Sequence, residues 1–274
     1  MGGARAALVL LLAAGCGPSP VASPSPSPSL LPGPRYTAVL TILENPEHAA
    51  ELCAGGVDES LPPQCGGVPV TPFSWDDVEG EQSVGGTTWL DAVRVVGSFY
   101  GTDKTFHLTE KPVAVAPPAP SPGRVDLATP CADPGGVTDR SRTSDGDREA
   151  AIASARKQPD VAGVWLDGAV LNLAFTGDLE RHEREARSQW GGPLCVSRLP
   201  RTYASLERTN ERIFTAAERA VAEEAGVYVY AGAVREDRND VEVSVLVADD
   251  VTRRWMADHY GGVVVLRPIF QPVP

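Results

Sequence analysis

The chain has 274 residues and a formal net charge of −12 at pH 7. A surface this acidic repels nucleic acid and anionic lipid headgroups, so composition argues against a nucleic-acid partner. The length is enough for two compact units at about 100–200 residues per domain.

The first sixteen residues have the features of an export signal. Arg5 provides a positive start, residues 6–14 form an apolar run too short to span a bilayer, and Ala13-Ala14-Gly15 place small residues before Cys16. This arrangement resembles a bacterial lipoprotein signal. The resemblance implies a signal peptide over 1–15. It also implies that Cys16 carries a diacylglycerol and a further acyl chain of the palmitate type. We therefore expect the protein to be anchored by lipid on the extracellular side of the cell membrane.

Two proline-rich stretches divide the rest of the chain. Residues 16–35 consist largely of Pro and Ser, and such a segment stays extended at about 3 Å per residue. Residues 116–128 contain a second proline-rich run, which predicts a domain boundary. We therefore predict one small domain over 36–115 and a second domain over 129–274.

Four cysteines follow the anchoring residue, an even number in a chain expected in an oxidising compartment. Three pairings are possible. We favour Cys53 with Cys65, which closes a short local loop, and therefore Cys131 with Cys195. A zinc site is the alternative, but these cysteines contain no C-x-x-C pair and the four histidines are scattered, so no metal and no cofactor is predicted.

The segment 36–115 has the pattern of strands and loops. Residues 36–43 and 92–100 are predicted strands, and 104–109 is the expected hairpin partner of the second. Between these strands we predict a long loop-rich insert pinned by the local disulfide. The fold predicted here is a small disulfide-pinned β-barrel or β-sandwich, similar to an oligomer-binding barrel.

The second domain contains an internal repeat. Val164 aligns with Val234, Leu173 with Val243, and Gly191-Gly192 with Gly261-Gly262, each pair 70 positions apart. Both copies, about 144–200 and 203–270, are predicted to follow the order αββαβ. The helices are expected over 144–157, 178–190, 203–224 and 249–260, and the strands over 161–166, 169–175, 193–198, 227–235, 240–247 and 263–269. The predicted fold class is therefore α+β.

Several segments carry a family resemblance. They are LENPEHAAELCAGGVDESLPPQCGGV (43–68), Thr129-Pro130-Cys131, WGGPLCV (190–196) and RNDVEV (238–243). Over most of its length after the signal, the chain resembles uncharacterised lipid-anchored or secreted proteins of high-GC Gram-positive bacteria. The second domain also has a weak topological similarity to the pro-regions of α-lytic-type proteases and, more distantly, to BON domains. These resemblances imply an architecture and no activity, because fold does not carry function.

No segment predicts catalysis. Ser154-Ala-Arg-Lys157 matches S-x-x-K, but the companion motifs of penicillin-binding enzymes are absent and Ser154 lies at the end of a predicted helix. His182 is predicted on the apolar face of its helix, where we interpret it as structural rather than as a catalytic base. We expect no enzyme and no catalytic residue.

Two further features favour structure over ligand binding. The acidic run Asp76, Asp77, Glu79 and Glu81 lacks the spacing of a calcium loop and is interpreted as a solvated loop. The aromatic residues Trp75, Trp89, Phe99 and Tyr100 are interpreted as core rather than as a binding platform.

The sequence therefore predicts a non-enzymatic, lipid-anchored extracytoplasmic protein that binds or scaffolds a component of the cell envelope. The expected partners are the membrane, through Cys16, and an unknown envelope protein or small ligand. Two alternatives remain open. The chain could be a small-ligand or ion-binding sensor, or its second domain could act as a pro-region-like inhibitor or chaperone of a protease.

Overall fold

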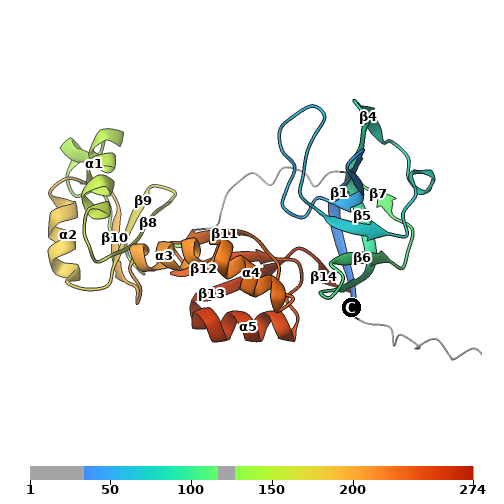
Figure 1. The fold of residues 1–274 in the computed structure, drawn as a ribbon. Helices are drawn as coiled ribbons and strands as arrows, with labels where there is room; N and C mark the ends of the chain where they lie inside the picture. Colours follow the sequence, from blue (N-terminus) through green and yellow to red (C-terminus); the bar gives the residue numbers. More distant parts are fainter. Residues whose placement is uncertain (1–33, 117–126, 274) are drawn as a thin grey trace, which may run out of the picture. The chain divides into compact units, whose positions relative to one another are not determined.

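The structure is a computed structural model that describes residues 34–116 and 127–273 (Figure 1). Cys16, the expected signal peptide and most of both predicted linkers lie outside these residues, so the predicted domain boundaries and the anchor stay predictions. Within the described ranges, no helix has the length and apolar character needed to cross a membrane.

The first part of the fold is a closed five-stranded β-barrel. Its strands are β1 (Arg35–Asn45), β2 (His48–Leu52), β3 (Val68–Thr71), β5 (Thr87–Tyr100) and β6 (Thr105–Leu108). They pair in the order β1-β2-β3-β6-β5, and β5 pairs again with β1, which closes the barrel. The pairing of β3 with β6 is parallel and the others are antiparallel. The barrel form of the predicted β-domain is confirmed.

The insert before residue 92 is pinned by the predicted disulfide, but it contains more strands than the sequence analysis expects. This stretch contains β2, β3, the 3₁₀ turn η1 (Trp75–Asp77), the short β4 (Gln82–Val84) and the first residues of β5. Strands β2 and β3 form part of the barrel wall. Strand β2 pairs with β1, with Ile42 opposite Leu52, and β3 pairs with β2. Strands of four or five residues carry too little alternation to be recognised in the sequence.

Both predicted disulfides are present. Cys53 and Cys65 are bonded, with a Cα–Cα distance of 5.5 Å, and so are Cys131 and Cys195, with a distance of 5.8 Å. The first bond closes the loop between β2 and β3. The second attaches the segment that precedes residue 134 to a strand of the next sheet.

The next part is a three-stranded sheet, ordered β10-β9-β8, with two helices. Its elements are α1 (Asp145–Arg156), β8 (Val161–Asp167), β9 (Val170–Phe175), α2 (Leu179–Arg187) and β10 (Leu194–Arg198). Ser144 starts α1 with a capping box to Asp147, as the sequence predicts. The helices cover one face of the sheet. On the other face Leu127 packs against Trp165 and Ala174, so β8 and β9 are buried on both sides.

The last part is a second three-stranded sheet, ordered β11-β12-β13. Its elements are α3 (Tyr203–Ile213), α4 (Ala216–Glu224), β11 (Val229–Arg235), β12 (Asp240–Val245), α5 (Asp250–Tyr260) and β13 (Val264–Pro268). The single helix predicted over 203–224 is wrong, because Thr215 interrupts it. Its hydroxyl accepts a hydrogen bond from the amide of Glu218 and starts α4 as a separate helix.

The end of the chain belongs to the core of the barrel. Phe270 is fully buried, and its ring centroid lies 4.7 Å from that of Phe106 and 5.6 Å from that of Phe99. Directly after it, β14 (Gln271–Pro272) pairs with β1. Leu246 and Tyr228 join the same cluster of buried side chains. Residues that flank the strands of the last sheet therefore complete the hydrophobic core of the barrel, whose first strand begins at residue 35.

Candidate functional site

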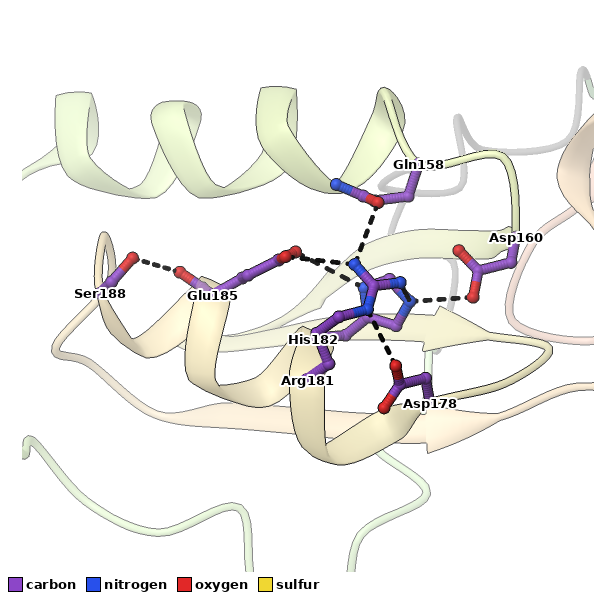
Figure 2. A network of polar contacts seen from close by, with 7 residues as sticks. All are labelled: Gln158, Asp160, Asp178, Arg181, His182, Glu185 and Ser188. Carbon is purple, nitrogen blue, oxygen red and sulfur yellow. Dashed lines mark hydrogen bonds and ion pairs between the residues drawn. The ribbon is translucent and has the colours of Figure 1, made fainter.

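The most deeply buried titratable side chain outside the barrel is His182, on α2 (Figure 2). Its ring is stacked on Phe175 at 3.6 Å between centroids. Its Nε2 lies 2.9 Å from Oδ2 of Asp160 and 3.0 Å from Nη2 of Arg181. Arginine can only donate a hydrogen bond and a carboxylate can only accept one, so Nε2 cannot bond to Arg181 and Asp160 at the same time. A protonated Nε2 donates to the Asp160 carboxylate.

The surroundings of His182 leave no room for a substrate. Its Nδ1 has no hydrogen-bond partner, and the adjacent cavity has a volume of about 10 Å³. This is about the space of one water molecule. Ser154 lines the same cavity but makes no hydrogen bond to His182. The arrangement therefore favours the structural interpretation of His182, in which the histidine joins α2 to the loop that carries Asp160.

Replacing His182 by Phe is expected to lower the free energy of unfolding by about 1–3 kcal/mol. The substitution keeps an aromatic ring against Phe175 but removes the hydrogen bond to Asp160, whose carboxylate then loses its donor. Urea unfolding measures the loss. His259→Phe is the matched control, because His259 is exposed and also stacks on an aromatic ring, that of Trp255. Equal stability changes in the two variants would contradict a structural role for the Asp160 bond.

A space of ligand size lies elsewhere, beside β8 and the β11–β12 hairpin. This pocket has a volume of about 730 Å³, within the range of about 300–1,000 Å³ that is common for small-molecule sites. Its apolar lining comes from Leu127, Val164, Trp165 and Val234. Trp165 is held in place because its Nε1 donates a hydrogen bond to the carbonyl of Ala128 at 3.2 Å. We call this space the hairpin pocket.

Charged residues of the hairpin form the rest of the lining. Arg235 is fully engaged, since its Nε and Nη2 each donate to Asp240 at 2.7 Å and its Nη1 donates to Glu242 at 3.0 Å. The hydrogen bonds to Asp240 raise the pKa of Arg235. This arginine is thus a permanent cation already matched by two carboxylates.

The next residue, Glu236, connects the hairpin to the first sheet. One carboxylate oxygen accepts from Arg156 at 2.7 Å, and the other accepts from the backbone amide of Val164 at 2.6 Å. Gly163 is required beside it, because a Cβ at this position would lie 2.8 Å from the carbonyl oxygen of Glu236. Glu236 is therefore a structural residue of the pocket wall.

Two carboxylates of the hairpin pocket retain free acceptors. Among the described residues, Asp237 forms an ion pair with Arg238 alone, at 3.2 Å through Oδ2. Glu242 uses Oε2 for Arg235, and its Oε1 forms a longer ion pair with Arg267 at 3.7 Å, beyond hydrogen-bond distance. No described residue donates a hydrogen bond to Oδ1 of Asp237 or Oε1 of Glu242. The pocket can therefore accept hydrogen bonds from a donor group of a ligand.

The other features singled out in the sequence do not form a site. Trp89 and Phe99 are buried in the barrel, and Trp75 donates a hydrogen bond from Nε1 to Glu44 at 2.6 Å. Among the described residues there is no group of three or more His, Cys, Asp or Glu side chains that could hold a metal ion. The acidic run near Trp75 gives no second sign of a bound cation.

The sequence did not predict the hairpin pocket. Its lining comes from residue 127, from β8 and from residues 234–242, which only the folded chain brings together. The one available signal is the charge-rich sequence Glu236-Asp237-Arg238 between the predicted strands 227–235 and 240–247. Comparison of the chain with protein-family models, with curated proteins and with solved structures finds no match.

Proposed function

We propose that this protein is a lipid-anchored, extracytoplasmic binding protein that holds a ligand or partner at the cell envelope without transforming it. The two disulfides are the observation that supports an extracytoplasmic location, since such bonds persist in oxidising compartments. The sequence before residue 17, which resembles a lipoprotein signal, supports attachment through Cys16.

The hairpin pocket supports the binding role. It combines an apolar wall, two arginines and three carboxylates in a space of about 730 Å³. The polar groups are arranged as ion pairs. No serine, cysteine or histidine, the usual nucleophile and base, is among the described residues that line the pocket. This chemistry favours recognition of a small ligand or a short segment of a partner over bond cleavage.

We also propose that the two sheets arose as copies of one αββαβ unit. In the first sheet Val164 lies opposite Leu173 and Leu171 opposite Leu194, and in the second Val234 lies opposite Val243 and Val241 opposite Val264. These registers differ by the same 70 positions as the sequence repeat. The similarity to protease pro-regions and BON domains, which rests on this element order, stays at the level of topology.

Anchoring is tested by labelling with radioactive palmitate in a Gram-positive host. We expect label on the wild-type protein, and we expect to recover it in the membrane fraction because the acyl chains on Cys16 insert into the bilayer. Cys16→Ser removes the only thiol at the expected cleavage site and should carry no label. Ser19→Ala, three residues away, is the control and should behave as wild type. Unlabelled wild-type protein in the cytosolic fraction would contradict the proposal.

A further inference from the structure

We propose that the hairpin pocket binds a ligand that presents an ammonium group on an aliphatic stem, such as an alkylamine or a lysine side chain. The inference deepens the proposed binding function and rests on it for its cellular context. It is carried by two carboxylates that line the same pocket as an apolar wall and that each keep one oxygen to which no described residue donates a hydrogen bond.

The charged groups of the lining are mostly paired with one another, and the positions left without a hydrogen-bond partner are acceptors. Three carboxylates and two guanidinium groups line the pocket, so its formal charge is negative. Arg235 is neutralised by its bonds to Asp240 and Glu242, and Arg238 is paired with Asp237. Glu236 is paired with Arg156, and Oε1 of Glu242 lies 3.7 Å from Arg267, so the lining offers a cation acceptor oxygens rather than a surplus of charge. The net charge of −12 of the whole chain adds a long-range attraction for cations.

The free oxygens suit an ammonium group rather than a second guanidinium group. Oδ1 of Asp237 and Oε1 of Glu242 belong to two different carboxylates, so neither offers a bidentate pair of acceptors. A planar guanidinium is best matched by two oxygens of one carboxylate, as Arg235 is by Asp240. An ammonium group has three donors that can point to separate acceptors.

The apolar wall supplies the second recognition element. The side chain of Trp165 is fixed by its bond to Ala128 and packs beside Leu127. Val164 and Val234 extend this wall from β8 and β11. An aliphatic stem in contact with these residues removes apolar surface from water while its charged end reaches the carboxylates. A small hydrophilic cation such as ammonium itself would gain nothing from this wall.

The test uses the full chain purified in a nonionic detergent and saturation-transfer NMR of small probes. N-acetyl-lysine methylamide carries the stem and the ammonium group, and N-acetyl-norleucine methylamide carries the stem alone. We expect saturation transfer to the lysine probe that weakens as salt is added, and binding of the norleucine probe at least tenfold weaker. Equal binding of the two probes, or no binding of the lysine probe, would overturn the proposal.

Matched variants locate the site. Asp237→Asn combined with Glu242→Gln should weaken binding of the lysine probe at least tenfold. Glu224→Gln combined with Asp258→Asn removes the same charge from exposed positions outside the pocket and should leave binding unchanged. Equal losses in the two double variants would show attraction by net charge alone and would overturn the proposal. Circular dichroism of each variant establishes that it is folded.

The source of the ammonium group is read from a third probe, a tetrapeptide with lysine at its second position. Binding at least tenfold tighter than that of the single-residue probe assigns the pocket to a segment of a polypeptide. Equal binding assigns it to small amines, and both results support recognition of an alkylammonium group. Failure of all probes alongside normal palmitate labelling would reject this ligand class and leave the membrane anchoring intact.

Discussion

Phe270→Ala is expected to lower the free energy of unfolding by about 3–5 kcal/mol, the range for a phenylalanine removed from a packed core. The ring is fully buried between Phe99 and Phe106, which belong to β5 and β6 of the barrel. Its backbone amide donates to the carbonyl of Leu246 at 2.8 Å. The substitution therefore leaves a cavity between the barrel and the end of the second sheet.

Urea unfolding followed by tryptophan fluorescence measures this loss. Val265→Ala is the matched control, because Val265 lies on the neighbouring strand β13 and is 38% exposed. A surface substitution of this kind changes stability by about 0.5 kcal/mol or less. The signals of Trp89 in the barrel and Trp255 on α5 should shift together in Phe270→Ala. A variant as stable as Val265→Ala would contradict the placement of Phe270 in the barrel core.

The burial of Phe270 in the barrel core is a feature that the sequence did not predict. The last strand was predicted over 263–269, and the structure has β13 over Val264–Pro268. The alternation of this strand is local and visible in the sequence. The position of Phe270 in the barrel core depends on contacts with Phe99 and Phe106, which are far away along the chain. No local pattern reports such a contact.

The contrast between local patterns and long-range contacts also explains why the two halves of the fold differed in how well they were predicted. The six strands predicted in the second half agree with β8 to β13 to within one or two residues, because β8, β9 and β12 alternate or are continuously apolar and end at turns such as Asp167-Gly168. The two-residue β14 was not predicted. Strand β2 has the sequence HAAEL, whose alanines and charges give no strand signal. It forms a strand because β1 and β3 on either side satisfy its backbone.

One error could have been avoided from the sequence. Thr215 and Glu218 have the T-x-x-E spacing that marks a helix start. The apolar periodicity across 203–224 outweighed this signal in the prediction of a single helix. In the structure Thr215 caps α4 through the amide of Glu218. The candidate site offered no equivalent signal, because Asp237 and Glu242 acquire their role only when β8 and Trp165 lie beside them.

Removal of the Cys131–Cys195 disulfide is the second change with a large expected effect. Replacing both cysteines by Ala should lower the free energy of unfolding by about 4 kcal/mol, because the bond spans 64 residues and restricts the unfolded chain. The bond also holds the segment in which Thr129 donates to Asp167 at 2.9 Å. Differential scanning calorimetry of the oxidised proteins measures the change.

The second disulfide of the chain provides the comparison. Cys53 and Cys65 are separated by 12 residues, so their replacement by Ala should cost about 3 kcal/mol. A larger loss for the 12-residue loop would contradict the chain-entropy argument.

The two variants should also differ in ligand binding. Leu127 lines the hairpin pocket and lies four positions before Cys131, so loss of the longer bridge should weaken binding of the lysine probe, whereas loss of the bridge in the barrel should not. That difference connects the disulfide framework to the pocket that we propose as the binding site.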